Sequence, residues 1–536
     1  MEQHLKASLT RRTFLAGSAV AAATAGLALS GCGSNDTSSS SDSGSADSGA
    51  AASGGALTVA SMNTTDTYMP FNCSKALALG ANWHVMEGLY ELDMATYKPY
   101  AALAAGDPVE VSETEYEVAL RDGAAFSDGT PVTADDVVKS YERTIGEKGA
   151  LYLSMLNFID SIEAKDDSTV TIKLAYPFSL LKERLPLIKV APASASDDVL
   201  TSQPVGTGPW MYASAPTEQA IEFAPNPNYN GSHPAKADTM HWDIIADDTA
   251  RTTALQEGTV QVMESVPADV ADQLTAAGVT VDDVQSFGLA FMMFNTKKKP
   301  FDDYRVRQAF LYAIDMEKLI NNALSGKATP LKSFLPENHA NFHEASTVYA
   351  YDPEKAKSLL AEAGVSDLSI VLNTTDTGFI VALAPQIQND LKEIGVTVTE
   401  IKSEPSKTMY PNYTDTDDPQ FDVVLAPGDP SCFGLDPDLL MNWWYGDNTW
   451  TQKRTQWKGS DEFAKLQDLL TQAAQAADAS AQQELWNQCF DLIAEQVPLY
   501  PLFHRTVSTG YWADQLTGFK PIGTTSVSMI DVAPKA

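Results

Sequence analysis

The sequence predicts an α/β fold, and three observations lead to that class. First, short runs rich in β-branched residues alternate with amphipathic helical patterns, which is typical of β-α-β units. Second, about 480 residues follow the N-terminal region, enough for two or three lobes with cores of their own. Third, no repeat of solenoid length occurs, which argues against a superhelical array.

The N-terminal residues predict an export signal. Residues 10–17 read TRRTFLAG, an arginine pair ahead of an apolar run that is too short to anchor the chain across a bilayer. Residues 29–32 read LSGC, which resembles a bacterial lipobox. We therefore expect a signal peptide of the twin-arginine type over residues 1–31 and a lipid anchor on Cys32 after cleavage.

Residues 32–55 are expected to form a flexible tether behind the lipidated cysteine. They are rich in serine and glycine and contain no large apolar side chain, so they cannot bury enough surface to fold. The formal net charge of the whole chain is −34. This charge excludes nucleic acid as a partner, and it fits either solubility beside a membrane or a cationic ligand.

The remaining cysteines give little information about redox chemistry. Cys73, Cys432 and Cys489 are far apart in sequence, and none has CxxC spacing. They allow one disulfide at most, and burial as small hydrophobic side chains is favoured for most of them.

The first predicted elements follow the tether. ALTVAS at 56–61 and TVTIKLAYPF at 169–178 predict strands. Between them, a strand from Tyr116 leads to a helix that Thr133 caps, with Asp136 at the third helical position. This capping box indicates that the carboxylates there start a helix and do not catalyse a reaction.

The second half of the chain shows clearer alternation of helices and strands. Apolar spacing, capping residues and proline at a first helical position define the segments. The predicted order is a helix from Val306, a helix capped by Asp352, a strand at 368–372, a helix at 379–393, a strand at 396–401, and helices at 461–477 and 481–496.

Motifs of common enzymes are absent from the sequence. VGTGPW at 205–210 contains G-x-G, but Pro209 opposes a helix start, so a phosphate cradle fails. No G-x-S-x-G, Walker lysine or HExxH occurs. His339 and His343 lie in a run without helical periodicity, which favours a solvated loop over a metal site. We therefore predict no catalytic residue, no metal and no cofactor.

Residues 428–447, GDPSCFGLDPDLLMNWWYGD, combine four carboxylates with two tryptophans. An EF-hand calcium loop fails, because Leu440 occupies the ligand position after Asp436 and Asp438. Asp429 and Asp436 each precede proline, which favours turn or extended backbone. The carboxylates are therefore expected on a loop.

The aromatic residues of this stretch are expected on the helix that the loop enters. LLMNWWY from Leu439 has the composition of a helix start. Adjacent helical residues point about 100° apart. Of Trp443 and Trp444, one is therefore expected in the core and the other at a cleft, where it would suit peptide side chains or the apolar faces of sugars.

Several motifs, in order along the chain, resemble the extracytoplasmic solute-binding proteins of ABC importers, in the peptide and nickel class called family five. The segments that carry the resemblance are WHVMEGLYELD (83–93), LRDGAAFSDGTPVTADDVVKSYER (120–143), VGTGPW (205–210), NPNYNG (226–231), TTALQEGTVQV (252–262), FNTKKKPFDDYRVRQAFLYAID (294–315) and VPLYPLF (497–503).

The resemblance implies a bilobal α/β fold with an extra subdomain and a hinge about which the two lobes close around a ligand. The expected lobe I comprises residues 56–82, 205–293 and 505–536. The extra subdomain is expected over 83–204 and lobe II over 294–504. A monomer is expected.

Matching the family's cleft position by position implies a set of ligand-binding residues. Peptide binders in the family pair the ligand's amino terminus with an aspartate, and Ala426 stands at the matching position here, so Asp429 or Asp436 would have to replace it. Glu264 could also neutralise a cation. The implied set is Met62, Asn63, Glu264, Gly288, Phe291, Asp429, Asp436, Trp443, Trp444, Tyr500 and Phe503.

The function implied by the resemblance is capture of oligopeptides or dipeptides outside the cell and delivery to a membrane permease. The lipid anchor would hold the receptor at the outer face of a membrane or in a periplasm. Two alternatives stay open: a receptor for an oligosaccharide or a nickel chelate, and a secreted enzyme on the same fold.

Overall fold

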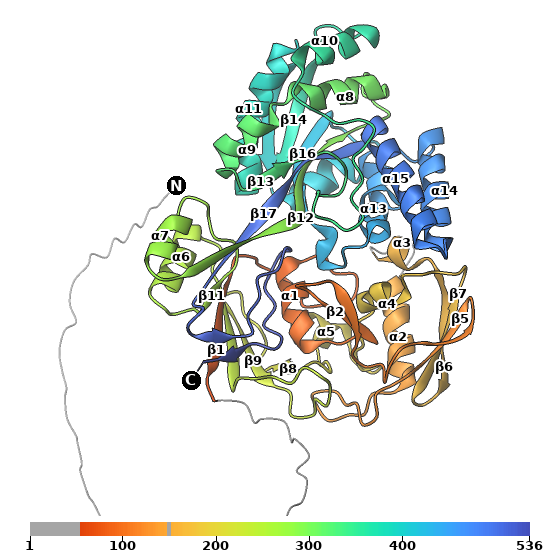
Figure 1. Cartoon of the computed structure of the whole chain (residues 1–536), viewed down its shortest axis with the longest axis vertical. Helices are drawn as coiled ribbons and strands as arrows, with labels where there is room; N and C mark the ends of the chain where they lie inside the picture. Colours follow the sequence, from red (N-terminus) through yellow and green to blue (C-terminus); the bar gives the residue numbers. More distant parts are fainter. Residues whose placement is uncertain (1–53, 147–151, 536) are drawn as a thin grey trace, which may run out of the picture. The chain divides into compact units, whose positions relative to one another are not determined.

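One mixed sheet of eleven strands organises the described part of the chain (Figure 1). The computed structural model describes residues 54–146 and 152–535, which belong to one compact unit. The strands of this sheet are β1 (Ala56–Ser61), β8 (Trp210–Tyr212), β9 (Ala220–Pro225), β10 (Thr239–Ile244), β11 (Val262–Met263), β12 (Thr280–Phe294), β13 (Ala328–Pro330), β14 (Ser369–Thr375), β15 (Thr397–Glu404), β16 (Val423–Gly428) and β17 (Leu499–Tyr511).

Helices alternate with these strands, largely as predicted. Asp352 caps its helix by accepting a hydrogen bond from the Lys355 backbone N–H at 2.9 Å. The helices that accompany the large sheet are α1 (Ala76–Val85), α6 (Asp248–Gln256), α7 (Ala271–Ala276), α8 (Tyr304–Ala313), α9 (Met316–Leu324), α10 (Pro353–Glu362), α11 (Gly378–Glu393), α12 (Ser406–Met409), α13 (Pro437–Tyr445), α14 (Asp461–Gln475) and α15 (Ala479–Gln496). Short 3-10 and π turns are η2 (Tyr410–Thr414), η3 (Pro430–Cys432) and η4 (Trp450–Arg454).

The strand order places two parallel groups on either side of a central antiparallel pair. The order is β15-β14-β16-β12-β17-β11-β1-β10-β9-β8, and β13 pairs with β17. β1 is parallel to β10 and β11, and β14 is parallel to β15 and β16. Parallel strands joined by helices confirm the predicted α/β class.

The central pair, β12 and β17, runs from one parallel group to the other (Figure 1). The pairing is regular from Thr280↔Tyr511 to Gln285↔Thr506 and resumes at Leu289↔His504. The register shift leaves Ser286 to Gly288 outside the ladder. Such an irregularity bends the strand that carries the extra residues, so β12 has a bend where it passes between the two groups.

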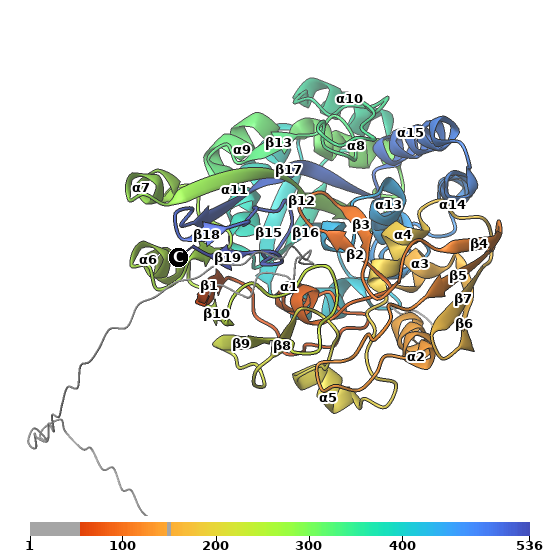
Figure 2. The same ribbon diagram turned by 60° about the horizontal axis from the view of Figure 1, so that its bottom comes forward.

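Residues 90–202 form a smaller layer with a sheet of its own (Figure 2). Its sheet has the order β4-β5-β7-β6, and the hairpin β2–β3 lies apart from it. The predicted capping box is confirmed, because Asp136 accepts a hydrogen bond from the Thr133 backbone N–H at 2.8 Å. The elements are β2 (Tyr90–Asp93), β3 (Lys98–Ala101), β4 (Val109–Ser112), β5 (Glu115–Ala119), α2 (Ala134–Ile145), α3 (Leu153–Leu156), β6 (Ile159–Asp166), β7 (Thr169–Leu174), α4 (Leu181–Arg184), η1 (Leu185–Leu187) and α5 (Asp197–Ser202); β18 (Leu516–Thr517) and β19 (Ala533–Pro534) pair near the C-terminus.

The hydrophobic cores cut across the sequence order. One cluster combines side chains of α2 and the small sheet with those of β12, β14, β16, α8 and α15. A second cluster combines β1, α1, β8 to β10 and part of the C-terminal segment. The small sheet therefore shares its core with the parallel group that contains β14 and β16.

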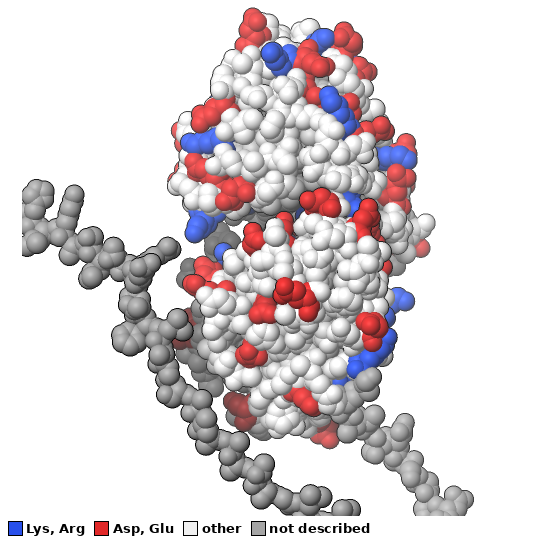
Figure 3. Space-filling model, turned by 90° about the vertical axis from the view of Figure 1, so that its left-hand side faces the viewer, with Lys and Arg blue, Asp and Glu red and all other residues white. Residues whose placement is uncertain are grey.

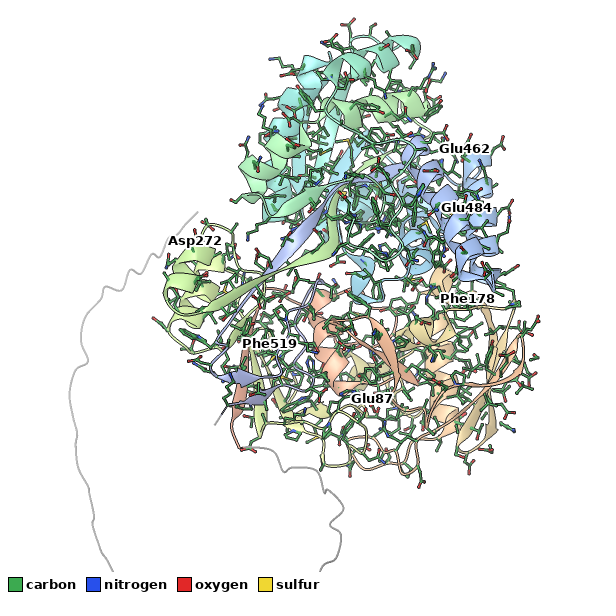
Figure 4. The ribbon with its side chains drawn as sticks, in the orientation of Figure 1. Glu87, Phe178, Asp272, Glu462, Glu484 and Phe519 are labelled. Atoms are coloured by element: carbon green, nitrogen blue, oxygen red, sulfur yellow. The ribbon has the colours of Figure 1, made fainter. Side chains whose placement is uncertain are left out.

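A buried ion cluster joins the small layer to α13. Arg184 is 1% exposed, and its guanidinium donates to Asp436 Oδ1 at 2.8 Å and to Asp438 Oδ2 at 3.1 Å. The guanidinium also donates to the Met155 carbonyl and lies over the ring of Phe178, which Figure 4 labels. We call Arg184, Asp436 and Asp438 the ion cluster.

Some predictions fall outside the described residues. The signal peptide (1–31), Cys32 and all but the last two residues of the tether lie there. Within the described residues, no helix has both the length and the apolar character needed to cross a membrane. The described cysteines Cys73, Cys432 and Cys489 are free thiols.

Candidate functional site

The carboxyl ends of two strands from each parallel group open on one cavity of about 330 Å³, which we call the first chamber. Met62 and Asn63 follow β1, Glu264 follows β11, Thr377 lies just beyond β14, and Asp429 follows β16. In open α/β sheets, ligands bind at the carboxyl ends of the strands. The sheet topology therefore makes this cavity the candidate binding site.

Glu264 lines the first chamber, but its carboxylate already accepts four hydrogen bonds from other residues of the protein. It accepts hydrogen bonds from the Ser61 hydroxyl at 2.8 Å, the Asn63 side-chain amide at 2.9 Å, and the backbone N–H groups of Met62 and Ser526. A carboxylate with four donors has little capacity left for a ligand cation. Glu264 fixes the residues after β1 against the C-terminal segment, and its expected role as a partner for a cation stays a prediction.

Asp429 also lines the first chamber, and no cationic side chain of the described residues forms an ion pair with its carboxylate. Its Oδ1 accepts hydrogen bonds from Ser431, and its Oδ2 accepts one from the Thr524 hydroxyl at 3.1 Å. Burial outweighs these bonds and raises the pKa of Asp429 above its ordinary value of 3.8. A positive group at this point would relieve the desolvation of the carboxylate.

Gly288 lies at the register shift of β12 and lines the first chamber. A Cβ atom added there would lie 2.9 Å from Ser286 Oγ and 3.4 Å from Asp429 Oδ2. A Cβ atom there would therefore crowd the Ser286 hydroxyl and make ordinary van der Waals contact with the Asp429 carboxylate. The predicted site residue Gly288 keeps the space in front of Asp429 open.

Arg505, in β17, also lines the first chamber, and the sequence analysis missed it. Its guanidinium lies 4.2 Å from the ring centroid of Phe379, and no carboxylate in the described residues forms an ion pair with it. Burial lowers the pKa of Arg505, and the charge of Asp429 opposes that shift. The available signal was a single charged residue within the otherwise uncharged strand LYPLFHRTVSTGY.

The N-terminus of α11 adds to the positive potential around Arg505. Thr377 and Phe379 line the same chamber, no side chain caps this end of the helix, and its first turn holds no acidic residue. The free amide groups and the dipole of a 16-residue helix favour an anion at this end. The chamber thus holds a negative group at Asp429 and a positive region at Arg505.

A second cavity of about 600 Å³, the second chamber, adjoins the first. Both predicted tryptophans, Trp443 and Trp444, line it. Trp444 is 1% exposed, and a Cβ atom on Gly428 would lie 2.3 Å from its ring, so only glycine fits between the chambers. Trp443 is half-buried, as expected for one tryptophan in the core and one at a cleft.

Three predicted aromatic site residues lie in the core and do not line either chamber. Phe291 is fully buried and packs against Trp444 with ring centroids 5.1 Å apart. Phe503 is also fully buried, and Tyr500 packs against Tyr349. Their positions on alternating faces of β12 and β17 point these side chains into hydrophobic core, so the structure does not bring them to either chamber.

Asp436 and Ala426 also do not line either chamber. Asp436 caps α13 by accepting from the Leu439 backbone N–H at 2.9 Å, and it belongs to the ion cluster with Arg184. Ala426 is fully buried within β16, opposite Phe291. Of the two substitutes for the expected aspartate, only Asp429 reaches the cavity.

The predicted loop histidines do not converge. His339 Nε2 lies 2.8 Å from the Leu435 carbonyl, whereas His343 Nε2 lies 3.2 Å from Asp491. Over residues 54–146 and 152–535, no group of three or more metal-ligating side chains was found.

Two α/β groups joined by β12 and β17, with charged side chains facing the cleft between them, form an arrangement that is typical of solute-binding proteins. The family model described as "Bacterial extracellular solute-binding proteins, family 5 Middle" matches residues 98–452, more than half of the chain. The chain therefore belongs to this family.

Individual proteins agree with that assignment. Heme-binding protein A of Haemophilus influenzae is 31% identical over 57% of this chain and 63% of its own length. The probable D,D-dipeptide-binding periplasmic protein DdpA of Escherichia coli is 24% identical over 75% of this chain and 78% of its own length. The chain thus spans less than two thirds of the Haemophilus protein.

The fold is also that of a solved relative. The periplasmic binding protein DppA from Helicobacter pylori, in complex with peptide STSA, superposes with a TM-score of 0.78 over 90% of this chain and 98% of its own. Its sequence identity is 22%, so this likeness shows the fold alone.

Proposed function

We propose that this protein captures short peptides outside the cell and delivers them to the permease of an ABC importer. The observation that carries the proposal is that Arg505 and Asp429 line one chamber and that, over residues 54–146 and 152–535, neither forms an ion pair. A zwitterionic peptide supplies the opposite charge to each. The dipeptide named for the Escherichia coli relative and the peptide bound by the Helicobacter pylori protein support the same ligand class.

Asp429 would receive the ligand's ammonium group. Its Oδ2 accepts hydrogen bonds from the hydroxyls of Thr524 and Thr525, which an ammonium can join or replace with charge-assisted ones. The open space in front of Gly288 leaves room for that group. Truncating one partner of such a buried charge pair typically costs about 2–5 kcal/mol of binding energy.

Arg505 would receive the ligand's carboxylate. Its stacking on Phe379 restrains the guanidinium before binding, so less side-chain entropy is lost. The free amide groups at the start of α11 supply further donors for an anion. The two ends of the ligand are therefore recognised by different elements.

The test compares one dipeptide in three chemical forms by calorimetry. Wild-type protein is expected to bind free Ala-Ala more tightly than N-acetylated Ala-Ala or Ala-Ala amide, each by about tenfold or more. Asp429→Asn should abolish only the discrimination against the acetylated form. Arg505→Gln should abolish only the discrimination against the amide.

Matched control variants remove charges elsewhere. Asp447→Asn and Arg305→Gln each replace a partly exposed, ion-paired side chain outside both chambers and should keep the wild-type pattern. Stabilisation of the protein by an oligosaccharide or a nickel chelate, with no response to any peptide, would overturn the proposal.

The location of the receptor is part of the same proposal. The twin-arginine-type signal and the LSGC motif support export and lipidation at Cys32. Mass spectrometry of the membrane fraction should find a chain that begins at a lipid-modified Cys32, and Cys32→Ala should release the protein from the membrane. Recovery of an unmodified, released wild-type chain would contradict the anchor.

The lobe boundaries are proposed on the same basis. Lobe I (56–82, 205–293 and 505–536) and lobe II (294–504), with residues 83–204 as the extra subdomain, would close about the segment where β12 and β17 connect the two groups. The two parallel groups of strands support this division. Small-angle scattering should record a decrease in the radius of gyration when peptide binds the monomer.

A further inference from the structure

The second chamber lies where the first side chain of a bound peptide would go. The two chambers share five residues: Ser74, Pro427, Gly428, Asp429 and Cys432. The side chain of a peptide's first residue branches from the carbon that carries the ammonium group. A ligand with its ammonium at Asp429 therefore has this side chain at the entrance of the second chamber.

Aromatic side chains form the walls of the second chamber, which are Tyr410, Phe433, Trp443, Trp444 and Trp450. The rings of Trp444 and Trp450 have centroids 4.5 Å apart, and Phe433 packs against Trp443 at 5.2 Å. Rings that are packed against one another lose little freedom when a ligand arrives. Such walls favour a planar apolar group that can stack or meet them edge to face.

The chamber is not a cage for a ligand cation, because the protein already fills that position. The guanidinium of Arg454 lies 4.0 Å from the Tyr410 ring centroid and 4.1 Å from that of Trp450. Asp415 pairs with the same guanidinium through two hydrogen bonds of 2.7 and 3.0 Å. The faces left for a ligand belong mainly to the half-buried Trp443.

Lysines add positive charge to the lining of the second chamber. Lys407 is exposed and has no carboxylate partner among the described residues, and Lys75 lies 3.7 Å from Asp66, with both side chains largely exposed. Exposed pairs of this kind neutralise little. The formal net charge of the chain is −34, and acidic side chains are spread over the face drawn in Figure 3. This chamber is therefore locally opposite in character to the protein as a whole.

Resting on the proposed function, we propose that the second chamber makes this receptor select peptides whose first residue is aromatic and reject those whose first residue is cationic. An aromatic side chain gains buried area and ring contacts at Trp443. A lysine or arginine side chain would meet Lys75, Lys407 and the occupied cage of Arg454. The overall charge would favour cationic peptides in solution, so the chamber reverses a preference that composition alone suggests.

The test measures the affinities of Phe-Ala, Ala-Ala and Arg-Ala for the full protein by calorimetry. Phe-Ala is expected to bind at least tenfold more tightly than Ala-Ala, and Arg-Ala more weakly than Ala-Ala. Trp443→Ala should bring the ratio of Phe-Ala to Ala-Ala affinity close to one. The double variant Lys75→Gln/Lys407→Gln should raise the affinity for Arg-Ala relative to Ala-Ala.

Controls separate this inference from the function on which it rests. Trp83→Leu replaces a half-buried tryptophan that lines a different cavity and should keep the wild-type ratio. Thermal unfolding checks that each variant is folded. If Trp443→Ala does not fold, the affinity ratios of the wild-type protein still test the selectivity. Peptides that bind with equal affinity whatever their first residue would overturn the selectivity alone. Failure of every peptide to bind would overturn both proposals.

Discussion

Replacement of Arg184 by methionine is expected to destabilise the protein strongly. The guanidinium is 1% exposed and compensates two carboxylates, of which the Asp438 side chain is 5% and the Asp436 side chain 10% exposed. Methionine keeps the apolar volume but leaves both carboxylates buried without a cation. Breaking a buried ion pair from one side costs about 3–5 kcal/mol, and we expect a loss in this range.

The pH dependence of the loss identifies its cause. Burial raises the pKa of Asp438, and Arg184 opposes that shift. Without Arg184 the folded state holds a carboxyl with a still higher pKa, so it binds a proton more readily than the unfolded chain does. The destabilisation should therefore be full at neutral pH and shrink as the pH falls through the raised pKa of Asp438.

Urea unfolding of Arg184→Met across this pH range supplies the measurement. Adding Asp436→Asn, which keeps the helix cap, and Asp438→Leu should restore most of the stability, because the uncompensated charges are gone. A loss below about 1 kcal/mol for Arg184→Met, or one that is independent of pH, would refute the reasoning, since exposed pairs behave in that way.

Three further changes test other parts of the structure. Gly428→Ala should destabilise the fold by about 1–3 kcal/mol in urea unfolding, because its Cβ would lie 2.3 Å from the Trp444 ring; an unchanged midpoint would contradict that contact. Glu264→Gln replaces an acceptor oxygen by a donor among four donors and should cost about 2–4 kcal/mol, which thermal unfolding would record as a lower Tm, whereas an unchanged Tm would argue against the network. Calorimetry of Ala-Ala binding should show affinity falling as acid protonates Asp429, and the fall should begin at higher pH than for an ordinary carboxyl, because its pKa is raised; Asp429→Asn should show no such dependence.

Local patterns in the sequence predicted most elements of the fold. The capping box at Thr133 and Asp136 and the cap at Asp352 stand where the sequence placed them, because a cap depends on residues only a few positions apart. The 15-residue strand β12 was not predicted as one element. Its bend and its pairing with β17 depend on partners more than 200 residues away, which local patterns do not specify.

Part of the site was predictable because a residue's position followed from the end of a strand. Met62, Asn63 and Asp429 follow strands whose carboxyl ends meet at the chamber, so matching positions along the chain sufficed. The burial of Phe291 and Tyr500 in the core was not predicted, because a one-residue shift in register changes the face of the strand on which a side chain lies. Arg505 was missed because the absence of an ion-pair partner, within the described residues, depends on which side chains surround it in the fold. A local sequence pattern does not contain that information.

The packing of Trp444 against Trp450, with ring centroids 4.5 Å apart, has an optical consequence. Two indoles at this separation and at 68° couple their electronic transitions, so the near-ultraviolet circular dichroism should carry a signature of their relative orientation. Trp443, half-buried beside them, emits according to how much water surrounds it. The wall of the second chamber thus holds an intrinsic spectroscopic reporter, and we expect its signal to change when a solute enters, without any added label.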